Sequence, residues 1–294
     1  MLLWVPEDED SDPFLERGDQ LCDLISNDPR AEKSVKQLQS VVVTGQSDWL
    51  IHGLLPHFSS NLTAVRLSQD CSMGASDTSF TDLSRQCPNL KSLSINQTLA
   101  TSEDLEEACK VWGDTLERLD IASIEDTRDW ISPIIPAMKV LKALKLGSGC
   151  CVRAQEVKAI ALAASPLEEI DLGDIYLSAA GDADEMDQAL ESMIDAHSPT
   201  LHILRLYGTD VGQPVMQSCK KARSLHTINL LLSYSPQASG VDDLLDACAG
   251  LDNFTGWFKD YSARWGEWEA RRKTRGEAEQ KRLRRDPTIY GLGT

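Results

Sequence analysis

The segment Pro199-Thr-Leu-His-Ile-Leu-Arg-Leu206 decides the fold, because its apolar pattern recurs along the chain. Leu201, Leu204 and Leu206 occupy the first, fourth and sixth positions of a short motif. Seven further copies align by the same positions: Leu38-Val41-Val43, Leu62-Val65-Leu67, Leu90-Leu93-Ile95, Leu116-Leu119-Ile121, Leu141-Leu144-Leu146, Leu167-Ile170-Leu172 and Leu225-Ile228-Leu230. A pattern repeated this often predicts one structural unit used many times.

The spacing of the copies identifies the type of repeat. Successive first positions lie 24 to 28 residues apart, except for a 34-residue step between Leu167 and Leu201. That period is typical of leucine-rich repeats. Alternation around the fourth and sixth positions predicts a short strand with one apolar face, and the residues that follow each strand show helical spacing. Since strands stack more closely than helices, the sequence predicts an α/β leucine-rich-repeat solenoid, a horseshoe with parallel strands on the concave face and helices on the convex face.

The repeats divide the chain into three parts. Residues 1–34 are predicted to form an acidic N-terminal segment and a capping helix, with a turn at Asn27-Asp28-Pro29. Residues 35–258 hold eight clear repeats and a degenerate ninth, in which Phe254 and Gly256 take the fourth and sixth positions. Residues 259–294 are predicted to form an amphipathic and then basic helical tail.

The C-terminal tail allows two interpretations. Its aromatic residues recur at helical spacing, as an apolar stripe of Trp257, Tyr261, Trp265 and Trp268. This helix either covers the last repeat or docks on a partner through its aromatic side chains. The basic cluster from Lys281 to Arg285 is either a solvated helix end or a signal for nuclear import or nucleic-acid binding.

The net charge of −17 limits the classes of partner. So acidic a chain repels nucleic acid and anionic membranes, and it favours basic or neutral proteins. No apolar run reaches the length of a membrane span, and Met1 to Pro6 is too short for a signal peptide. We therefore expect an intracellular protein, cytoplasmic or nuclear, that does not associate with membranes.

The motifs of common enzymes are missing from the sequence, so we expect no catalytic site and no cofactor. His202 and His226 share the second position of adjacent copies and are expected to lie close together. Two histidines without a further ligand make a poor metal site, so no metal is expected.

Four of the eight cysteines recur just before the first leucine of a copy, where a helix ends and a strand begins. A small, buried, apolar thiol suits that place better than a disulfide or a zinc site. We therefore predict structural packing for Cys87, Cys109, Cys219 and Cys248.

Side chains beside the strand leucines should point into the concave face. They combine charge, hydrogen-bonding groups and an aromatic ring, a composition typical of protein-recognition surfaces. Within this face, reversing Lys145 and Arg205 to Glu is expected to abolish partner capture in a folded chain. The predicted partner-binding residues are Arg66, Asn96, Arg118, Asp120, Lys145, Glu169, Asp171, Arg205, Tyr207 and Asn229.

The strings from Cys87 to Ile95 and from Cys219 to Leu230 resemble the cysteine-containing repeats of F-box proteins, within the ribonuclease-inhibitor-like superfamily. The stretch from Leu21 to Leu38 is similar to the segment before the repeats in fungal members. The resemblance implies a substrate receptor of a cullin-RING (SCF-type) ubiquitin ligase, with a protein substrate on the concave face and contacts to the ligase adaptor and cullin. Residues 1–34 depart from the family, being too short for an F-box and lacking its Leu-Pro opening.

Two other functions remain open on the sequence. One is a stoichiometric regulator or scaffold, similar to repeat proteins that activate GTPases or inhibit enzymes. The other is association of nucleic acid with the basic tail, which the overall acidity makes the less expected of the two.

Overall fold

The computed structural model describes residues 2–4, 23–44, 53–68, 79–98, 102–124, 130–147, 150, 152–173, 182–207, 212–230, 243–244, 246–248, 250–251, 253–256, 270 and 273–274. Its strands form one 10-stranded parallel sheet in which neighbours in sequence are neighbours in space. They are β1 (Leu2–Trp4), β2 (Ser40–Thr44), β3 (Ala64–Ser68), β4 (Ser92–Thr98), β5 (Arg118–Ile124), β6 (Ala143–Leu146), β7 (Glu169–Leu172), β8 (Ile203–Leu206), β9 (Thr227–Leu230) and β10 (Asn253–Gly256).

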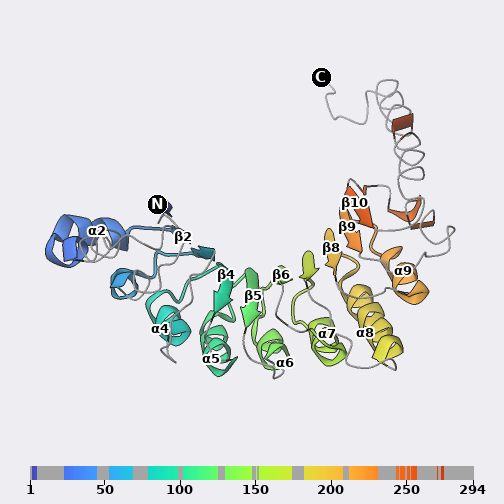
Figure 1. The fold of residues 1–294 in the computed structure, drawn as a ribbon, viewed down its shortest axis with the longest axis horizontal. Coiled ribbons are helices and arrows are strands. Elements are labelled where there is room, and N and C mark those ends of the chain that lie inside the picture. The colour runs from blue at the N-terminus through green and yellow to red at the C-terminus, as the bar shows by residue number, and fades with distance from the viewer. Residues whose placement is uncertain are drawn as a thin grey trace, which may run out of the picture.

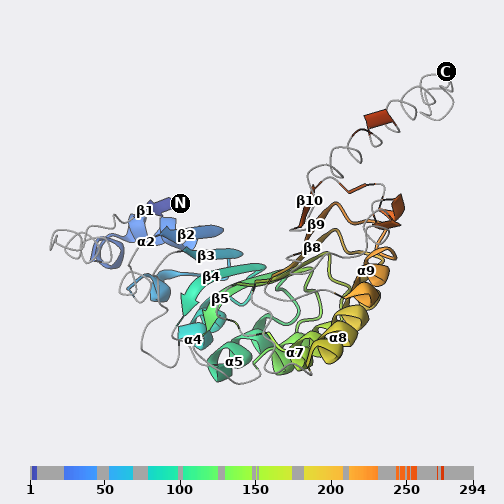
Figure 2. The same cartoon turned by 45° about the vertical axis from the view of Figure 1, so that its right-hand side comes forward.

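Helices follow the strands and cover the outer side of the sheet. They are α2 (Pro29–Lys36), η1 (Leu55–His57), α4 (Ser79–Gln86), α5 (Ser102–Trp112), α6 (Ile131–Ile134), η2 (Ile135–Ala137), α7 (Ala154–Ala161), α8 (Asp182–His197) and α9 (Gln213–Cys219). Figures 1 and 2 show strands on the inside of an arc and helices on its outside. Parallel strands lie about 4.8 Å apart whereas packed helices need about 8–10 Å, so the array bends toward the sheet. The predicted leucine-rich-repeat horseshoe is confirmed.

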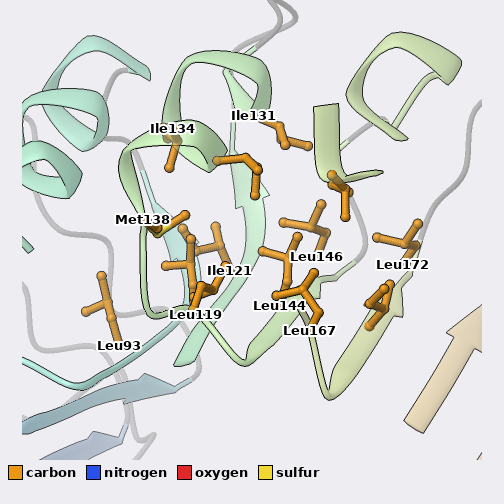
Figure 3. Packing of buried hydrophobic residues seen from close by; sticks show 14 of the residues in the cluster. Leu93, Leu119, Ile121, Ile131, Ile134, Met138, Leu144, Leu146, Leu167 and Leu172 are labelled. Atoms are coloured by element: carbon orange, nitrogen blue, oxygen red, sulfur yellow. The ribbon is translucent and has the colours of Figure 1, made fainter. Parts of the chain in front are cut away.

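The repeated leucines form the core between the two layers. Leu116, Leu119 and Ile121 of the fourth copy are almost completely buried, as are their equivalents in the next three copies. In Figure 3, Ile131 and Met138 from the outer layer point toward these strand residues. Since each copy has an apolar side that only its neighbours and its own helix cover, stacking supplies the core that a single repeat lacks.

The two prolines of the fourth copy limit its helix, as the sequence predicts. Pro133 lies inside α6, which has four residues, and Pro136 lies inside the three-residue η2 that follows. Proline lacks the backbone donor that continues an α-helix, so the α-helix of this repeat is short.

The 34-residue step contains a long helix. The sequence predicts a surface loop at Ser178–Asp184 within this step. In the structure α8 begins at Asp182 and has 16 residues, against 8 in α7. Residues 182–184 of the predicted loop are therefore helical, and residues 178–181 lie outside the described residues.

Two N-terminal elements were not predicted. Within residues 1–34, for which the sequence predicts only an acidic segment and a capping helix, β1 adds a strand that pairs in parallel with β2. Helix α2 begins at the predicted turn: the Asp28 carboxylate accepts a hydrogen bond from the Arg30 amide at 2.8 Å, and Pro29 occupies the first turn. Asp28 is therefore a helix N-cap. Most of the predicted helix from Phe14 to Ile25 lies outside the described residues.

At the other end, β10 continues the sheet at the predicted ninth copy, where Phe254 pairs with Ile228 and Gly256 with Leu230 of β9. Of the predicted C-terminal tail, residues 270, 273 and 274 are described, and all are helical and exposed. Its aromatic stripe and its basic cluster lie outside the described residues.

Buried polar contacts tie helix α5 to the repeat that holds α4. Asp104 of α5 accepts hydrogen bonds from the amides of Phe80 and Thr81 at 2.8 and 3.0 Å, and thereby caps α4. The Trp112 indole donates to the Cys87 carbonyl at 2.9 Å. These hydrogen bonds hold the two adjacent repeats together, in addition to the burial of their apolar side chains.

The four repeat cysteines are buried, which confirms their predicted packing role. Desolvation raises the pKa of Cys87, Cys109 and Cys219 to about 12 and that of Cys248 to about 11. They are protonated thiols at neutral pH, and a protonated thiol is a poor nucleophile.

Candidate functional site

The fifth motif positions form one column across the concave face, in the register that the sequence predicts. Arg66 of β3 pairs with Ser94, and Asp120 of β5 pairs with Lys145. The column ends with three further neighbours: Asp171, Arg205 and Asn229. A slip of one residue would turn every one of these side chains toward the core, so the buried leucines on either side hold the column in place.

The centre of the column is a chain of polar contacts between strands. The Ser94 hydroxyl donates to the Asp120 carboxylate at 3.1 Å. The Lys145 ammonium lies 3.7 Å from the same carboxylate oxygen, Oδ2 of Asp120, and about half of the Lys145 side chain is exposed. Lys145 is thus held near Asp120 and also accessible from the concave side.

Arg205 is the most enclosed cation of the predicted set. Its guanidinium lies 3.1 Å from the Asp171 carboxylate and 3.3 Å from that of Glu169. Asp171 is only 5% exposed. Burial raises the pKa of Asp171, while the adjacent Arg205 acts against this rise. Reversing Arg205 would place a second charge of the same sign beside a buried carboxylate, so it would disturb the fold as well as the surface. The sequence had suggested that Lys145 and Arg205 are equivalent. Their surroundings show that they are not.

Arg118 reaches across a neighbouring strand to share the Glu169 carboxylate. Their atoms Nη1 and Oε2 are 2.7 Å apart, although Ala143 of β6 lies between them in the sheet. About half of the Arg118 side chain is exposed, whereas Glu169 is largely covered. Glu169 therefore organises two arginines, one exposed and one enclosed.

The remaining predicted residues have different surroundings. Tyr207 and Asn229 are half-buried and joined by a hydrogen bond of 2.7 Å from the amide of Asn229, and burial raises the pKa of Tyr207. Arg66 is exposed and has no hydrogen bond or ion pair with any side chain that the structure describes. The backbone of Asn96 lies in β4, but its side chain is outside the described set.

A second row of charges was missed by sequence analysis. It runs along the second motif positions, where charges alternate in the order Lys91, Glu117, Lys142 and Glu168. The Glu117 carboxylate lies 2.9 Å from the Lys142 ammonium and 3.7 Å from the Lys91 ammonium. The hydrogen bond from Lys142 lowers the pKa of Glu117. The alternation itself was the available signal, but the second position precedes the strand and was not expected to line the face.

A pocket of about 250 Å³ opens between this row and the strands beside it. It spans β5 to β8 and is lined by Glu117, Arg118, Lys142, Ala143, Glu168, Glu169, His202 and Ile203. Two of the predicted residues, Arg118 and Glu169, thus belong to a concave feature with a defined shape.

The two histidines lie together, as predicted from their shared position. The rings of His202 and His226 stack with centroids 5.5 Å apart and planes at 15°. Stacked rings do not converge on a common ion. Among the described residues, no group of three or more His, Cys, Asp or Glu side chains is arranged to hold a metal.

Across the parts of the chain that the structure covers, no helix has both the length and the apolar character needed to cross a bilayer.

Comparison with known proteins adds a likeness to solved structures. No protein-family model matches the sequence, and neither does any curated protein. Among solved structures, the chain is similar to the crystal structure of the leucine-rich repeat-containing protein LegL7 from Legionella pneumophila, with 11% identity and a TM-score of 0.39 over 88% of this chain and 91% of that chain. The fold follows from the ladder and core of this chain, which is an α/β leucine-rich-repeat solenoid with a charged, hydrogen-bonded concave face.

Proposed function

We propose that the concave face binds a protein partner and that the chain acts by binding, without catalysis of its own. The observation that carries this proposal is a network of ion pairs. Glu169 binds both Arg118 and Arg205, and Arg205 also binds Asp171. Side chains held in place before binding lose little entropy when a partner arrives. A rigid strand face with fixed charges of both signs is suited to selecting one protein surface among many.

The composition of the face supports the same proposal. Arginine and tyrosine are enriched among residues that dominate binding energy, and both occur here, as Arg66, Arg118 and Tyr207. The exposed members Arg66 and Lys145 are the ones expected to meet the partner first, because their charges remain accessible from the concave side.

The test is affinity capture from the native cells with charge-reversed variants. Arg66→Glu combined with Lys145→Glu should reduce recovery of the partner about tenfold or more, since the change removes two accessible cationic donors and reverses the local potential of the face. The matched control combines Lys33→Glu with Lys158→Glu, which reverses one cation without a described partner and one paired cation on the convex helices. Unchanged recovery with the concave variant, or equal loss with the convex one, would contradict the proposal.

For the finer role, we propose the substrate-recognition subunit of a cullin-RING ubiquitin ligase. The support is the resemblance of the cysteine-containing repeats to those of fungal F-box proteins, carried by the strings that begin at Cys87 and Cys219. Capture of the full chain should then recover the ligase adaptor and cullin together with the substrate. Recovery of one folded enzyme, with altered activity and without ubiquitylation, would instead favour a stoichiometric regulator.

A further inference from the structure

The pocket over Ala143 has the size of a site for one side chain. Its volume is about 250 Å³. Sites for small molecules and cofactors usually occupy about 300–1,000 Å³. The pocket lies on the concave face, where the proposed function places the partner, and the inference below rests on that function.

The charges around the pocket leave one carboxylate without an ion pair at contact distance. The walls carry three carboxylates, Glu117, Glu168 and Glu169, and two cations, Arg118 and Lys142. Arg118 is bound to Glu169 at 2.7 Å and Lys142 to Glu117 at 2.9 Å. Glu168 is exposed and forms no hydrogen bond or ion pair with a described side chain, although its charge is felt by Lys142.

Apolar surface accompanies the free carboxylate. The buried Ala143 of β6 lines the pocket, and the half-buried Ile203 lines it from β8, on the far side of β7. A small apolar wall beside acidic groups matches a side chain with a long aliphatic stem and a cationic head, because such side chains bury the stem and keep the head at polar groups.

An anionic occupant fits this pocket poorly. A carboxylate or phosphate would have to draw Arg118 away from Glu169, or Lys142 away from Glu117. Either exchange leaves a wall carboxylate with only its more distant cation, Arg205 at 3.3 Å from Glu169 or Lys91 at 3.7 Å from Glu117. The anion would also lie close to the free charge of Glu168. Both effects oppose anion binding, since like charges in a partly enclosed site repel strongly.

We infer that this pocket receives a lysine or arginine side chain of the bound protein, with the cationic head at Glu168 and the stem against Ala143 and Ile203. The pocket then makes the concave face selective for a basic residue, which agrees with the acidity of the whole chain, −17 in net charge.

The test uses the full chain with isotope-labelled alanine and isoleucine methyl groups, followed by NMR. The probe is a capped five-residue peptide with a central arginine, and the control probe has citrulline there, which keeps the shape and removes the charge. The arginine peptide should shift the methyl signals of Ala143 and Ile203 saturably, and the citrulline peptide should not.

Two variants assign the effect to Glu168. Glu168→Gln should weaken the arginine peptide about fivefold, the factor that corresponds to about 1 kcal/mol for an accessible ion pair. Asp184→Asn removes the same charge from an exposed position on the convex helix α8 and should leave the affinity within about twofold. Ala143→Val, which adds volume at the pocket wall in a residue type suited to strands, should also suppress the shifts.

Several results would overturn the inference: unmoved methyl signals, equal shifts with arginine and citrulline, an unchanged affinity in Glu168→Gln, or tighter binding of a phosphoserine peptide. These outcomes are separable from failure of the proposed function. If the concave variants lose the captured partner while the arginine peptide leaves Ala143 unmoved, the binding face stands and the pocket assignment falls. If those variants keep the partner while the peptide binds, the face assignment falls and a cation-binding pocket remains.

Discussion

Arg118 and Glu169 form an ion pair of 2.7 Å across an entire intervening strand. Adjacent strands lie about 4.8 Å apart, so the backbones of Arg118 and Glu169 are separated by about twice that distance. It can do so because the residue between them in the sheet is Ala143, whose side chain is too short to stand in the way. One small residue therefore creates both the long-range ion pair and part of the wall of the adjacent pocket.

The two arginines on Glu169 should differ strongly in their effect on stability. Arg205→Met is expected to lower the free energy of unfolding by about 3 kcal/mol, because it leaves the buried Asp171 without its cation. Arg118→Met should lower it by less than about 1 kcal/mol, since that side chain is half exposed. Urea unfolding of both variants at pH 7.5 measures the difference.

The ion pair between Arg205 and Asp171 should also make the stability of the Arg205→Met variant depend on pH. Without Arg205, the already raised pKa of Asp171 should rise further, so the folded variant binds a proton more readily than the unfolded chain. Its stability deficit should therefore shrink as the pH falls from about 7.5 to 5. Equal deficits for the two methionine variants, or a deficit that grows on acidification, would contradict the enclosed role of Arg205.

Asp104 should contribute more to stability than an ordinary helix carboxylate. Asp104→Ala removes the acceptor for the Phe80 and Thr81 amides at the start of α4, and we expect a loss of about 1–3 kcal/mol. Asp82→Ala is the control within the same region, because Asp82 forms an exposed pair with Arg85 and should contribute about 0.5 kcal/mol or less. Thermal unfolding of Asp104→Ala and Asp82→Ala measures the two losses of stability. Similar losses would mean that Asp104 does not link the repeats.

His197 should make the fold sensitive to acid. It is buried, its Nδ1 accepts from the Leu167 amide at 3.1 Å, and its Nε2 lies 2.9 Å from the Ile160 carbonyl, to which it donates. Burial lowers the pKa of His197, against the opposing effect of that carbonyl. Protonation would put a second N–H against the Leu167 amide, so the unfolded chain binds this proton more readily.

Since the folded pKa of His197 lies below the unfolded value near 6.5, stability should be lost as the pH falls through about 6.5 and below. His197→Gln keeps one donor and one acceptor without titrating, and should cost about 1–2 kcal/mol at pH 8. Chemical denaturation from pH 8 to 5 should show the wild type losing more stability than the variant. Parallel curves would show that His197 does not titrate on unfolding.

Ser218 is a site where a smaller side chain should stabilise the fold. Its hydroxyl is buried in α9 and has no hydrogen-bond partner within the described structure. Ser218→Ala removes an unsatisfied group and favours the helix, so a gain of about 1 kcal/mol is expected. Ser192→Ala, at an exposed hydroxyl that donates to the Gln188 carbonyl, should change stability by less than about 0.5 kcal/mol. A loss in Ser218→Ala, measured by thermal unfolding, would contradict this account.

The repeat pattern predicted the register of strands β2 to β9. Because the fourth and sixth positions must face the core, the register of Asp120 with Lys145 and of Asp171 with Arg205 followed from counting alone. Strand β1 could not be predicted in this way, since Leu2–Trp4 precedes the first copy and carries no periodic signal.

The character of individual site residues was less accessible from the sequence. Alternation places both Lys145 and Arg205 on the concave face, but only the structure shows that Glu169 and Asp171 enclose Arg205 while Lys145 remains accessible. Such differences depend on side-chain contacts between repeats 25 to 34 residues apart, which a pattern within one repeat does not contain. The role of Glu168 was missed for the same reason.

The most direct test of the central claim is site-specific photo-crosslinking to the captured partner. A photoreactive phenylalanine derivative replaces Lys145 on β6 or, in a matched chain, Lys158 on the convex helix α7; these lysine side chains are 47% and 51% exposed. If the concave face binds the partner, illumination should link the partner to position 145 and leave position 158 unlinked. A crosslink from position 158 without one from position 145 would place the partner on the helices and contradict the account.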